Sequence, residues 1–425
     1  MNLKRSFVLF VSLLFLNLLS AEGKILTIED AVRLAKENNI SVKKAENNLD
    51  SLAVQNKYSW NSVSPAAKLN GNFEDDIEND STAFSLSGAV NLSLKTNLYS
   101  EIKGAKLNYE KGLLTYSEAV RQIELSVRKK FYNLIYQKEN LVLQNRSLET
   151  SRAQYLNNEE KFKNGKISEL DAFTSRVNYE SKKPVVESAE INFQNDLASF
   201  KQLLGIPQET EIALDGSLDD FLNLKEISFG LLPKVDEPAP DVKSAEYDVE
   251  IAKNSLLNLR FSAYAPVITG SYSYGKSKKS MQDDWMTTNQ LSVGVSVPLD
   301  GILPWSSSAV NIKKQKNALD TAEKVLEDAK TTVAVQTESY IRKINQAVKQ
   351  LDSLKSTEKL AEQTYKMTLA AYNYGKTDFL SLQNANDSVL SAGVNLKSQA
   401  YTLISTILDL ESVLGLEFGT LETKN

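Results

Sequence analysis

Polar and apolar residues alternate strictly in four short segments of the chain. In the first pair, apolar side chains or glycine occupy every second position from Ala67 to Phe73 and most such positions from Phe84 to Leu94. The same alternation returns about 200 residues later. Because a period of two places successive side chains on opposite faces of a strand, the sequence predicts two β-hairpins, at residues 66–95 and 267–299.

The two faces of these strands differ, since one is apolar and the other consists largely of Ser, Asn and Gly. Half of a soluble β-sandwich would show a similar alternation, but only four such strands are found in 425 residues, and small polar side chains suit a water-filled lumen. Such strands are typical of a transmembrane β-barrel. Four strands cannot close a barrel, so copies must pool their strands. A pair would give a barrel filled by its own side chains, whereas three copies would give a twelve-stranded barrel with room for a channel.

After each β-hairpin the hydrophobic period changes to that of a helix. Residues 100–163 and 308–373 predict two helices, each about 95–100 Å long at about 1.5 Å per residue. Apolar residues recur every seven positions in the first helix. The second helix repeats this pattern except at one position, which Glu358 occupies. A seven-residue period predicts a coiled-coil seam. The seam residues are Leu134, Leu141, Leu148, Tyr155 and Phe162, echoed by Ile344, Leu351, Tyr365 and Tyr372.

Shorter elements complete the prediction. A helix runs from Ile28 toward Trp60, with Thr27 as its N-cap and Asp30 completing a weak capping box. Other short elements are expected as follows: a helix at residues 241–262, a strand at 211–214 and a short helix near 218–224.

Two return helices, at residues 169–204 and 378–414, follow the long helices and predict antiparallel helical hairpins. Pro184 lies inside the first return helix and cannot donate a backbone hydrogen bond. Gly393 lies at nearly the matching place in the second. We therefore expect each return arm to consist of two stacked helices.

The helical part of the sequence is duplicated. Tyr155 aligns with Tyr365, and at the same offset of 210 residues Gly165-Lys166 aligns with Gly375-Lys376. Glycine between two helical runs is typical of a tight helical turn, so each repeat carries one hairpin tip. The expected organisation is a signal peptide at 1–21, a first repeat at 22–206 with its tip near 164–168, an inter-repeat linker at 207–240, a second repeat at 241–416 with its tip near 374–378, and a tail at 417–425.

The N-terminus and the composition restrict the classes of function. Residues 1–21 have a basic start, an apolar run from Phe7 to Leu19 and a small-residue end, the pattern of a secretory signal peptide. The chain has no cysteine and no histidine, which excludes disulfides, thiol nucleophiles, histidine-based triads and the usual zinc sites. The net charge of −5 does not favour nucleic acid as a partner. The sequence therefore predicts a non-enzyme without cofactor or metal.

Several motifs, taken in order, resemble those of the TolC-like outer-membrane efflux protein family (outer membrane factor) over roughly residues 26–416. They are LTIEDAVRLAKENN, APDVKSAEYDVEIAKN, a proline before each strand pair, and the tips FKNGKISELDAF and YNYGKTDFLSL ahead of LLGI and VLGL. The resemblance implies a mainly α fold and a homotrimer. Each chain would contribute four strands to a twelve-stranded barrel in the outer membrane, long helical hairpins to a periplasmic α-barrel, and an equatorial belt.

The resemblance also implies where partners bind. In that family the hairpin tips close the periplasmic end and dock with a periplasmic adaptor (membrane fusion) protein of an inner-membrane pump. Three residues of this chain depart from the family pattern at the gate: Thr377 stands at an arginine position, and Ser381 and Asn384 stand at acidic positions. By position, the docking tips are Asn164, Gly165, Lys166, Tyr374, Gly375 and Lys376, and the gate candidates are Asp171, Tyr372 and Asp378.

Each of these residues also has a purely structural interpretation. Gly165 and Gly375 are needed by any tight helical turn. Lys166 and Lys376 are solvated cations near a helix end, and acidic residues such as Asp171 cap or begin a helix. The sequence alone leaves both interpretations open.

The favoured function is a passive exit duct of a tripartite efflux or type I secretion system, located in the outer membrane and extending into the periplasm. The sequence leaves the substrate and the class of pump open. The alternative is a non-transporting structural coiled-coil envelope protein that bridges the outer membrane and the periplasm.

Overall fold

The computed structural model describes residues 24–76, 81–224, 238–278 and 283–421. The predicted signal peptide, part of the linker and the last residues of the tail lie outside this range. The chain divides into two compact units, which are described separately. The tip unit comprises Met1–Lys43, Ala119–Glu237 and Ala334–Asn425, and the strand unit comprises Lys44–Glu118 and Pro238–Val333.

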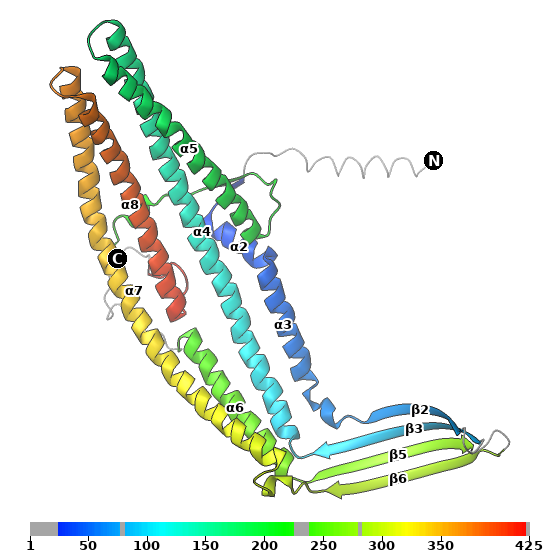
Figure 1. Ribbon diagram of the computed structural model, residues 1–425. Helices are drawn as coiled ribbons and strands as arrows, with labels where there is room; N and C mark the ends of the chain where they lie inside the picture. The colour runs from blue at the N-terminus through cyan, green and yellow to red at the C-terminus, as the bar shows by residue number, and fades with distance from the viewer. Residues whose placement is uncertain (1–23, 77–80, 225–237, 279–282, 422–425) are drawn as a thin grey trace, which may run out of the picture. The chain divides into compact units, whose positions relative to one another are not determined.

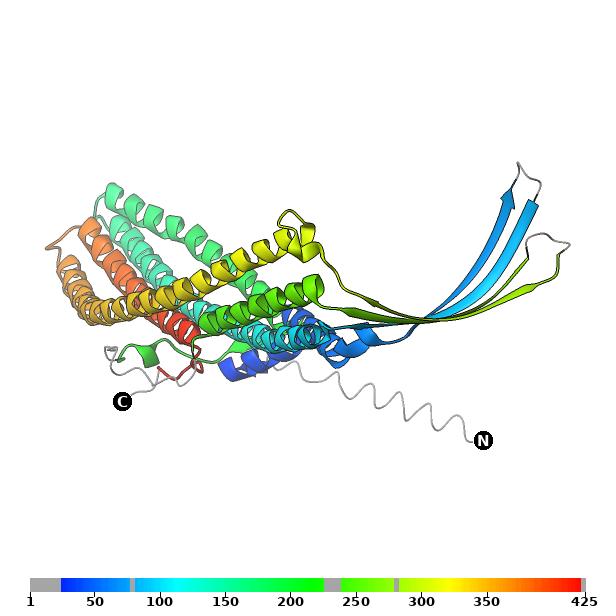
Figure 2. The ribbon, with the colours of Figure 1, turned by 90° about the horizontal axis from the view of Figure 1, so that it is seen from below.

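The strand unit contains one antiparallel sheet of four strands in the order β2-β3-β5-β6 (Figure 1). The two hairpins of the sequence lie side by side because β3 pairs with β5, with Val90 opposite Tyr272. Within the chain β2 and β6 each pair on one side only. Figure 2 shows the strands running together and bending along their length. Their bounds are Ala66–Asp76 for β2, Ser81–Lys95 for β3, Val267–Lys278 for β5 and Met286–Ser296 for β6.

Helix α6 (Pro240–Tyr264) is held against the start of α4 (Leu98–Lys163) by amide side chains in the strand unit. Asn254 Nδ2 donates to the carbonyl of Ser100 at 2.8 Å, and Asn97 Nδ2 donates to Asn258 Oδ1 at 2.8 Å. Asn97 and Asn254 are both buried, so these hydrogen bonds satisfy polar groups away from water.

The tip unit consists mainly of two antiparallel helical hairpins (Figure 1). The first hairpin is formed by α4 and α5 (Glu169–Leu204), and the second by α7 (Ser307–Asn373) and α8 (Phe379–Leu414). Heptad residues of both long helices, including Leu134, Ile344 and Leu351, are buried in one apolar core. The other fully buried large side chains of this core include Phe131, Ile135, Phe200, Leu204 and Leu403.

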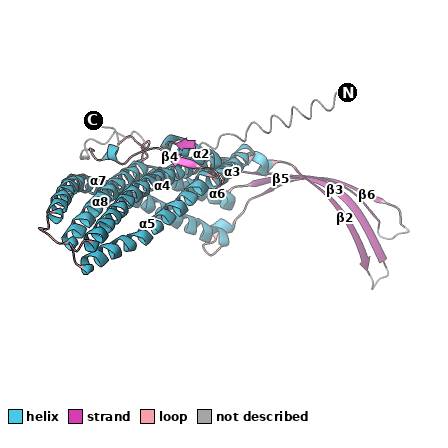
Figure 3. Cartoon of the chain, turned by 90° about the horizontal axis from the view of Figure 1, so that it is seen from above, coloured by secondary structure: helices cyan, strands magenta, loops and turns pink. Residues whose placement is uncertain are grey.

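A short parallel sheet joins the start of the first repeat to the inter-repeat linker. Strand β4 (Ile212–Leu214) lies where the sequence predicted a strand, and it pairs with β1 (Lys24–Leu26), which was not predicted. Figure 3 shows β4 as a short strand beside α2 (Ile28–Asn38). The short helix expected after β4 is a 3-10 turn at Asp219–Phe221.

The prediction of one continuous helix from Ile28 toward Trp60 is wrong, because α2 and α3 (Ile40–Lys57) are separated at Asn39. The backbone of Asn39 is extended, and its side-chain oxygen accepts a hydrogen bond from the Ser41 backbone N–H at 2.7 Å. Its Nδ2 donates to the carbonyl of Leu203, also at 2.7 Å. Asparagine competes in this way for backbone hydrogen bonds, so it ends one helix and begins the next.

The prediction of two stacked helices in each return arm is also wrong. Helix α5 continues through Pro184, and α8 continues through Gly393. A proline removes one helical hydrogen bond, but Lys182, two residues earlier, donates to Ser147 Oγ of α4 at 2.8 Å and holds α5 against α4. Gly393 allows close packing, because a Cβ there would lie 3.2 Å from the Leu143 side chain.

No helix among the described residues has the length and hydropathy needed to span a bilayer.

Candidate docking and gating site at the hairpin tips

The two tips have the same backbone conformation. Gly165 has φ 67° and Gly375 has φ 69°, both in the left-handed region that favours glycine. The Gly165 and Lys166 N–H groups each donate at 2.8 Å, to the carbonyls of Phe162 and Lys161. The second tip repeats both bonds, from Gly375 N–H and Lys376 N–H, at 3.0 and 2.9 Å. This is the Schellman arrangement, which satisfies the last carbonyls of a helix.

The acidic gate candidates start the return helices. Ser168 is the N-cap of α5, accepting from the Asp171 backbone N–H at 3.1 Å while its hydroxyl donates to Asp171 Oδ2 at 2.7 Å. Asp378 is itself the N-cap of α8 and accepts from the Ser381 N–H at 2.7 Å. Hydrogen bonds from the side chain and the backbone of Ser381 lower the pKa of Asp378. Both carboxylates therefore have a capping role within their own hairpin.

The docking candidates form the exposed end of each hairpin. Asn164 and Lys166 are exposed at the first tip, and Tyr374 and Lys376 are exposed at the second. The ring of Tyr374 is 81% exposed, an unusual position for a large aromatic side chain unless it meets a partner. A Cβ added at Gly165 or Gly375 would have no atom within 4 Å, so these glycines are required by backbone conformation rather than by space.

Tyr372 connects the two hairpins. Its hydroxyl donates to Asn158 Oδ1 of α4 at 2.7 Å, whereas the side chain of Asp171 is engaged by Ser168. The ring packs against the buried Phe379 with 6.0 Å between ring centroids. Burial raises the pKa of Tyr372, and the charge of Asp171 raises it further, so the phenol stays protonated and remains a donor.

Asn158 was missed by sequence reasoning. It belongs to a row of buried polar residues on α4, which lies beside the apolar heptad seam that the sequence predicts. The sequence did contain the signal, because polar residues follow one another at intervals of four, three and four positions, and this spacing places them on one face of the helix. The row is Ser147, Ser151, Gln154 and Asn158, and we call it the polar stripe.

Two residues that depart from the expected gate pattern make contacts within their own helix. The N–H of Ser381 is used in the cap of α8, and the carbonyl of Asn384 accepts from the Ser388 hydroxyl at 2.7 Å. Among the described residues no group of three or more acidic side chains could hold a metal ion.

Known proteins resemble the chain in sequence and in fold. Residues 231–416 match the family model described as outer membrane efflux protein. The outer membrane protein TolC of Vibrio cholerae is 19% identical over 306 residues, which are 71% of this chain and 69% of TolC. The CmeC outer membrane channel of Campylobacter jejuni superposes with a TM-score of 0.77 at 18% identity, covering 94% of this chain and 87% of CmeC. The outer membrane protein VceC of Vibrio cholerae gives a TM-score of 0.72 at 13% identity, covering 92% and 96%.

These similarities confirm two predictions made from the sequence: the family resemblance and the fold class. The relatives named here are outer membrane proteins, which agrees with the predicted location of this chain. The shared fold combines long helical hairpins with four longer strands per chain. The roles of the individual tip residues stay predictions.

Proposed function

We propose that this chain, whose residues 231–416 match the family model described as outer membrane efflux protein, is the exit duct of a tripartite efflux or type I secretion system. The observation that carries the proposal is the four-stranded sheet, in which β2 and β6 each leave one edge unpaired within the chain. Unpaired backbone groups in lipid cost several kcal/mol each, on the order given for buried polar groups. Further copies of the chain supply the missing pairs.

Three copies give a closed barrel wide enough for a channel. The apolar side chains of β6 support a lipid-facing surface, because Leu291, Val293 and Val295 alternate along the strand and are at least 69% exposed in one chain. Between them stand Ser292 and Gly294, the small residues that suit a lumen. The duct performs no chemistry of its own, and substrate moves down the gradient that an inner-membrane pump creates.

The exposed tips are the proposed docking surface for a periplasmic adaptor protein. The repeated Gly-Lys pair presents one cation at each tip, so the adaptor surface that it meets is expected to carry acidic groups. Tyr374 supplies an exposed aromatic anchor at the second tip. The gate is held by Tyr372 through Asn158, with Asp171 and Asp378 fixing the start of each return helix.

Planar-bilayer recording of the purified protein tests the duct. We expect low conductance in the closed protein and a higher conductance in Tyr372→Phe, which lacks the hydroxyl that bonds to Asn158. If neither the wild type nor this variant conducts at all, the duct proposal fails and the structural envelope protein is favoured.

Crosslinking in cells tests the docking surface. A photo-reactive amino acid placed at Lys166 or Lys376 is expected to capture a periplasmic adaptor protein of an inner-membrane pump. The same probe at Lys313, an exposed lysine of α7 in the strand unit, is the control and is not expected to capture that protein. Equal capture from all three positions, or capture of no adaptor, contradicts docking at the tips.

A further inference from the structure

Two residues that interrupt the sequence pattern lie next to each other in the tip unit. Glu358 interrupts the heptad seam of α7, and Gly393 lies inside α8, where most side chains would favour the helix more. A Cβ at Gly393 would lie 3.5 Å from Glu358 Oε1 and 3.2 Å from Leu143 Cδ1. At the aligned positions of the first repeat stand Leu148 and Lys183, so neither feature is duplicated. Two departures from local preference at one place are typical of a functional site.

These two residues border a cavity of about 220 Å³ between α4, α7 and α8. A single water needs only about 10–15 Å³ of such space, so the cavity has room for a small organic molecule. Leu143, Val389 and Leu390 give it an apolar wall. The residues that line the cavity all belong to the tip unit.

Four charged side chains line the cavity, and none of the four forms an ion pair with another described residue. Glu358 and Glu362 are half-buried and one turn apart on α7, which places them on the same helix face. Arg146 and Lys366 are exposed, so the cations lie nearer to the solvent than the carboxylates do. Burial and the charge of Glu362 raise the pKa of Glu358, as expected for a carboxylate that no cation contacts.

The buried part of the lining contains an amide group with an unused acceptor. Asn386 is 6% exposed, and its Oδ1 accepts no hydrogen bond from the described residues. Its Nδ2 makes one long contact, 3.4 Å to Ser147 Oγ. Buried amide groups normally have hydrogen-bond partners. Asn386 therefore leaves an acceptor for a donor group on a bound molecule.

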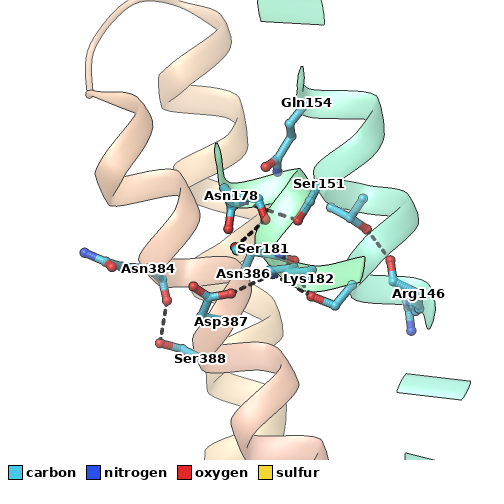
Figure 4. A network of polar contacts seen from close by, with 12 residues as sticks. Arg146, Ser151, Gln154, Asn178, Ser181, Lys182, Asn384, Asn386, Asp387 and Ser388 are labelled. Atoms are coloured by element: carbon cyan, nitrogen blue, oxygen red, sulfur yellow. Dashed lines mark hydrogen bonds and ion pairs between the residues drawn. The ribbon is translucent and has the colours of Figure 1, made fainter. Parts of the chain in front are cut away.

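Lys182 of α5 holds this polar lining in place, and its own charge is already paired. Its ammonium group lies 2.8 Å from Asp387 Oδ1 of α8 and 2.8 Å from Ser147 Oγ of α4 (Figure 4). Ser147 and Asp387, the residue after Asn386, are thus fixed by one cation. A site whose polar groups are held before binding loses less free energy in ordering them.

We propose that this cavity binds a small zwitterion, a molecule in which a short apolar chain separates an ammonium group from a carboxylate. The ammonium group lies between Glu358 and Glu362 and donates to Asn386 Oδ1, and the carboxylate faces Arg146 and Lys366. A molecule with only one charge would leave half of these groups unpaired. A metal ion is a poorer fit, because the described residues include no group of three acidic side chains that could hold one.

Calorimetric titration of the purified protein in a non-ionic detergent tests the site. The probe is ε-aminocaproate, a six-carbon chain with an ammonium group at one end and a carboxylate at the other. Hexylamine and hexanoate have the same chain length and only one of the two charges, so they are the matched ligands. We expect ε-aminocaproate to bind more tightly than either. Absence of binding, or equal binding of all three molecules, overturns the inference.

Charge variants separate the two halves of the site. Glu358→Gln keeps the size of the side chain and is expected to weaken binding of both ε-aminocaproate and hexylamine about tenfold, because a charge-assisted hydrogen bond is lost. The double variant Arg146→Met/Lys366→Met is expected to weaken ε-aminocaproate but not hexylamine. Glu327→Gln, at an exposed position of α7 in the strand unit, is the control and should bind like the wild type. Equal affinities of Glu358→Gln and Glu327→Gln for ε-aminocaproate contradict the site.

A variant without any change of charge tests the cavity itself. Gly393→Val places a side chain in the space next to Glu358 and Leu143 and is expected to abolish binding of ε-aminocaproate. Circular dichroism checks that this variant is folded, and tight binding by the folded variant places the ligand elsewhere and overturns the inference. Binding is measured without conductance, so its loss refutes only this site, whereas a wild type that never conducts refutes only the duct.

Discussion

Helix α4 buries two very different surfaces within the tip unit. One lies around Val127, Phe131 and Leu134, which are at most 1% exposed and join the apolar core. The other is the polar stripe, of which Ser151 and Asn158 are equally buried. Equal burial therefore does not mean equal strength of attachment, since the energy depends on what each side chain loses on exposure to water.

The difference can be estimated from general magnitudes. Burying a large apolar side chain contributes about 1.5–3 kcal/mol. A buried hydrogen bond contributes only about 0.5–1.5 kcal/mol net, and an unsatisfied polar atom costs about 1–3 kcal/mol. The stripe holds two such atoms, on Gln154 and Asn158. The apolar part of α4 therefore contributes more to the stability of the tip unit than the polar stripe does.

Paired truncations in the two surfaces should give the largest difference. Leu403→Ala removes a side chain that is 0% exposed in the apolar core and is expected to cost about 2–5 kcal/mol. Ser151→Ala, also at a fully buried position, is expected to cost less than about 1 kcal/mol because its hydrogen bond with Asn178 is 3.4 Å long. Thermal unfolding of the detergent-solubilised protein, followed by circular dichroism, measures both. Equal losses of stability would remove the distinction between the two surfaces.

Glu411 shows how a buried polar group behaves when its bonds are complete. Its carboxylate, at a residue 0% exposed near the apolar core, accepts from the N–H groups of Gly419 and Leu421 at 3.0 and 2.7 Å. Glu411→Ala would leave both donors unpaired, so we expect a loss of about 2–3 kcal/mol and release of the tail. Thermal unfolding and proteolysis of the tail measure the two effects. Glu417→Ala, an exposed neighbour, is the control with the same charge change. Equal behaviour of the two variants would contradict this role.

The tip glycines can be tested without disturbing either buried surface. Gly165→Ala forces a Cβ into the left-handed region and is expected to cost about 1–2 kcal/mol, although the space around it is open. Gly165→Asn should cost less, because asparagine tolerates this conformation better. Thermal unfolding ranks the two variants. If alanine and asparagine are equally tolerated, backbone conformation does not explain the glycine.

Periodicity predicted most of the fold because it reports which side chains face apolar surroundings. Heptad leucines such as Leu134 and Leu351 are buried as expected, and the alternating strands form the sheet. What it missed is polar: Asn39 breaks a helix through side-chain hydrogen bonds, and Asn158 is the partner of Tyr372. Such partners depend on which helices meet, and that is a tertiary property that the local pattern of one helix does not contain.

Proline was misjudged for a related reason. Pro184 removes one hydrogen bond from α5, but Lys182, two residues before it, contacts both α4 and α8 and holds the helix there. Gly393 was interpreted as a helix break. Its missing side chain instead provides room for the side chains of Leu143 and Glu358, which lie next to it. Tertiary packing outweighed local propensity at both positions.

The seam carboxylate Glu358 gives the smallest expected effect, which is a dependence of folding stability on pH. Burial raises its pKa above the ordinary 4.5, and the charge of Glu362 adds to this, while Lys397 acts in the opposite direction. Because the folded-state pKa is raised, the stabilising contribution of protonation is complete below the unfolded pKa and is lost as pH rises through the folded one. At neutral pH the charged Glu358 carboxylate therefore destabilises the packing around it.

Glu358→Gln removes that charge and should make the protein slightly more stable than the wild type at neutral pH. On acidification toward pH 4.5 the wild type should approach the variant, since both side chains are then largely neutral. Glu327→Gln, at an exposed position of α7, has the same charge change and should show neither effect. If Glu358→Gln is instead less stable than the wild type at neutral pH, charged Glu358 strengthens the packing between the hairpins, and the expected sign of its effect is wrong.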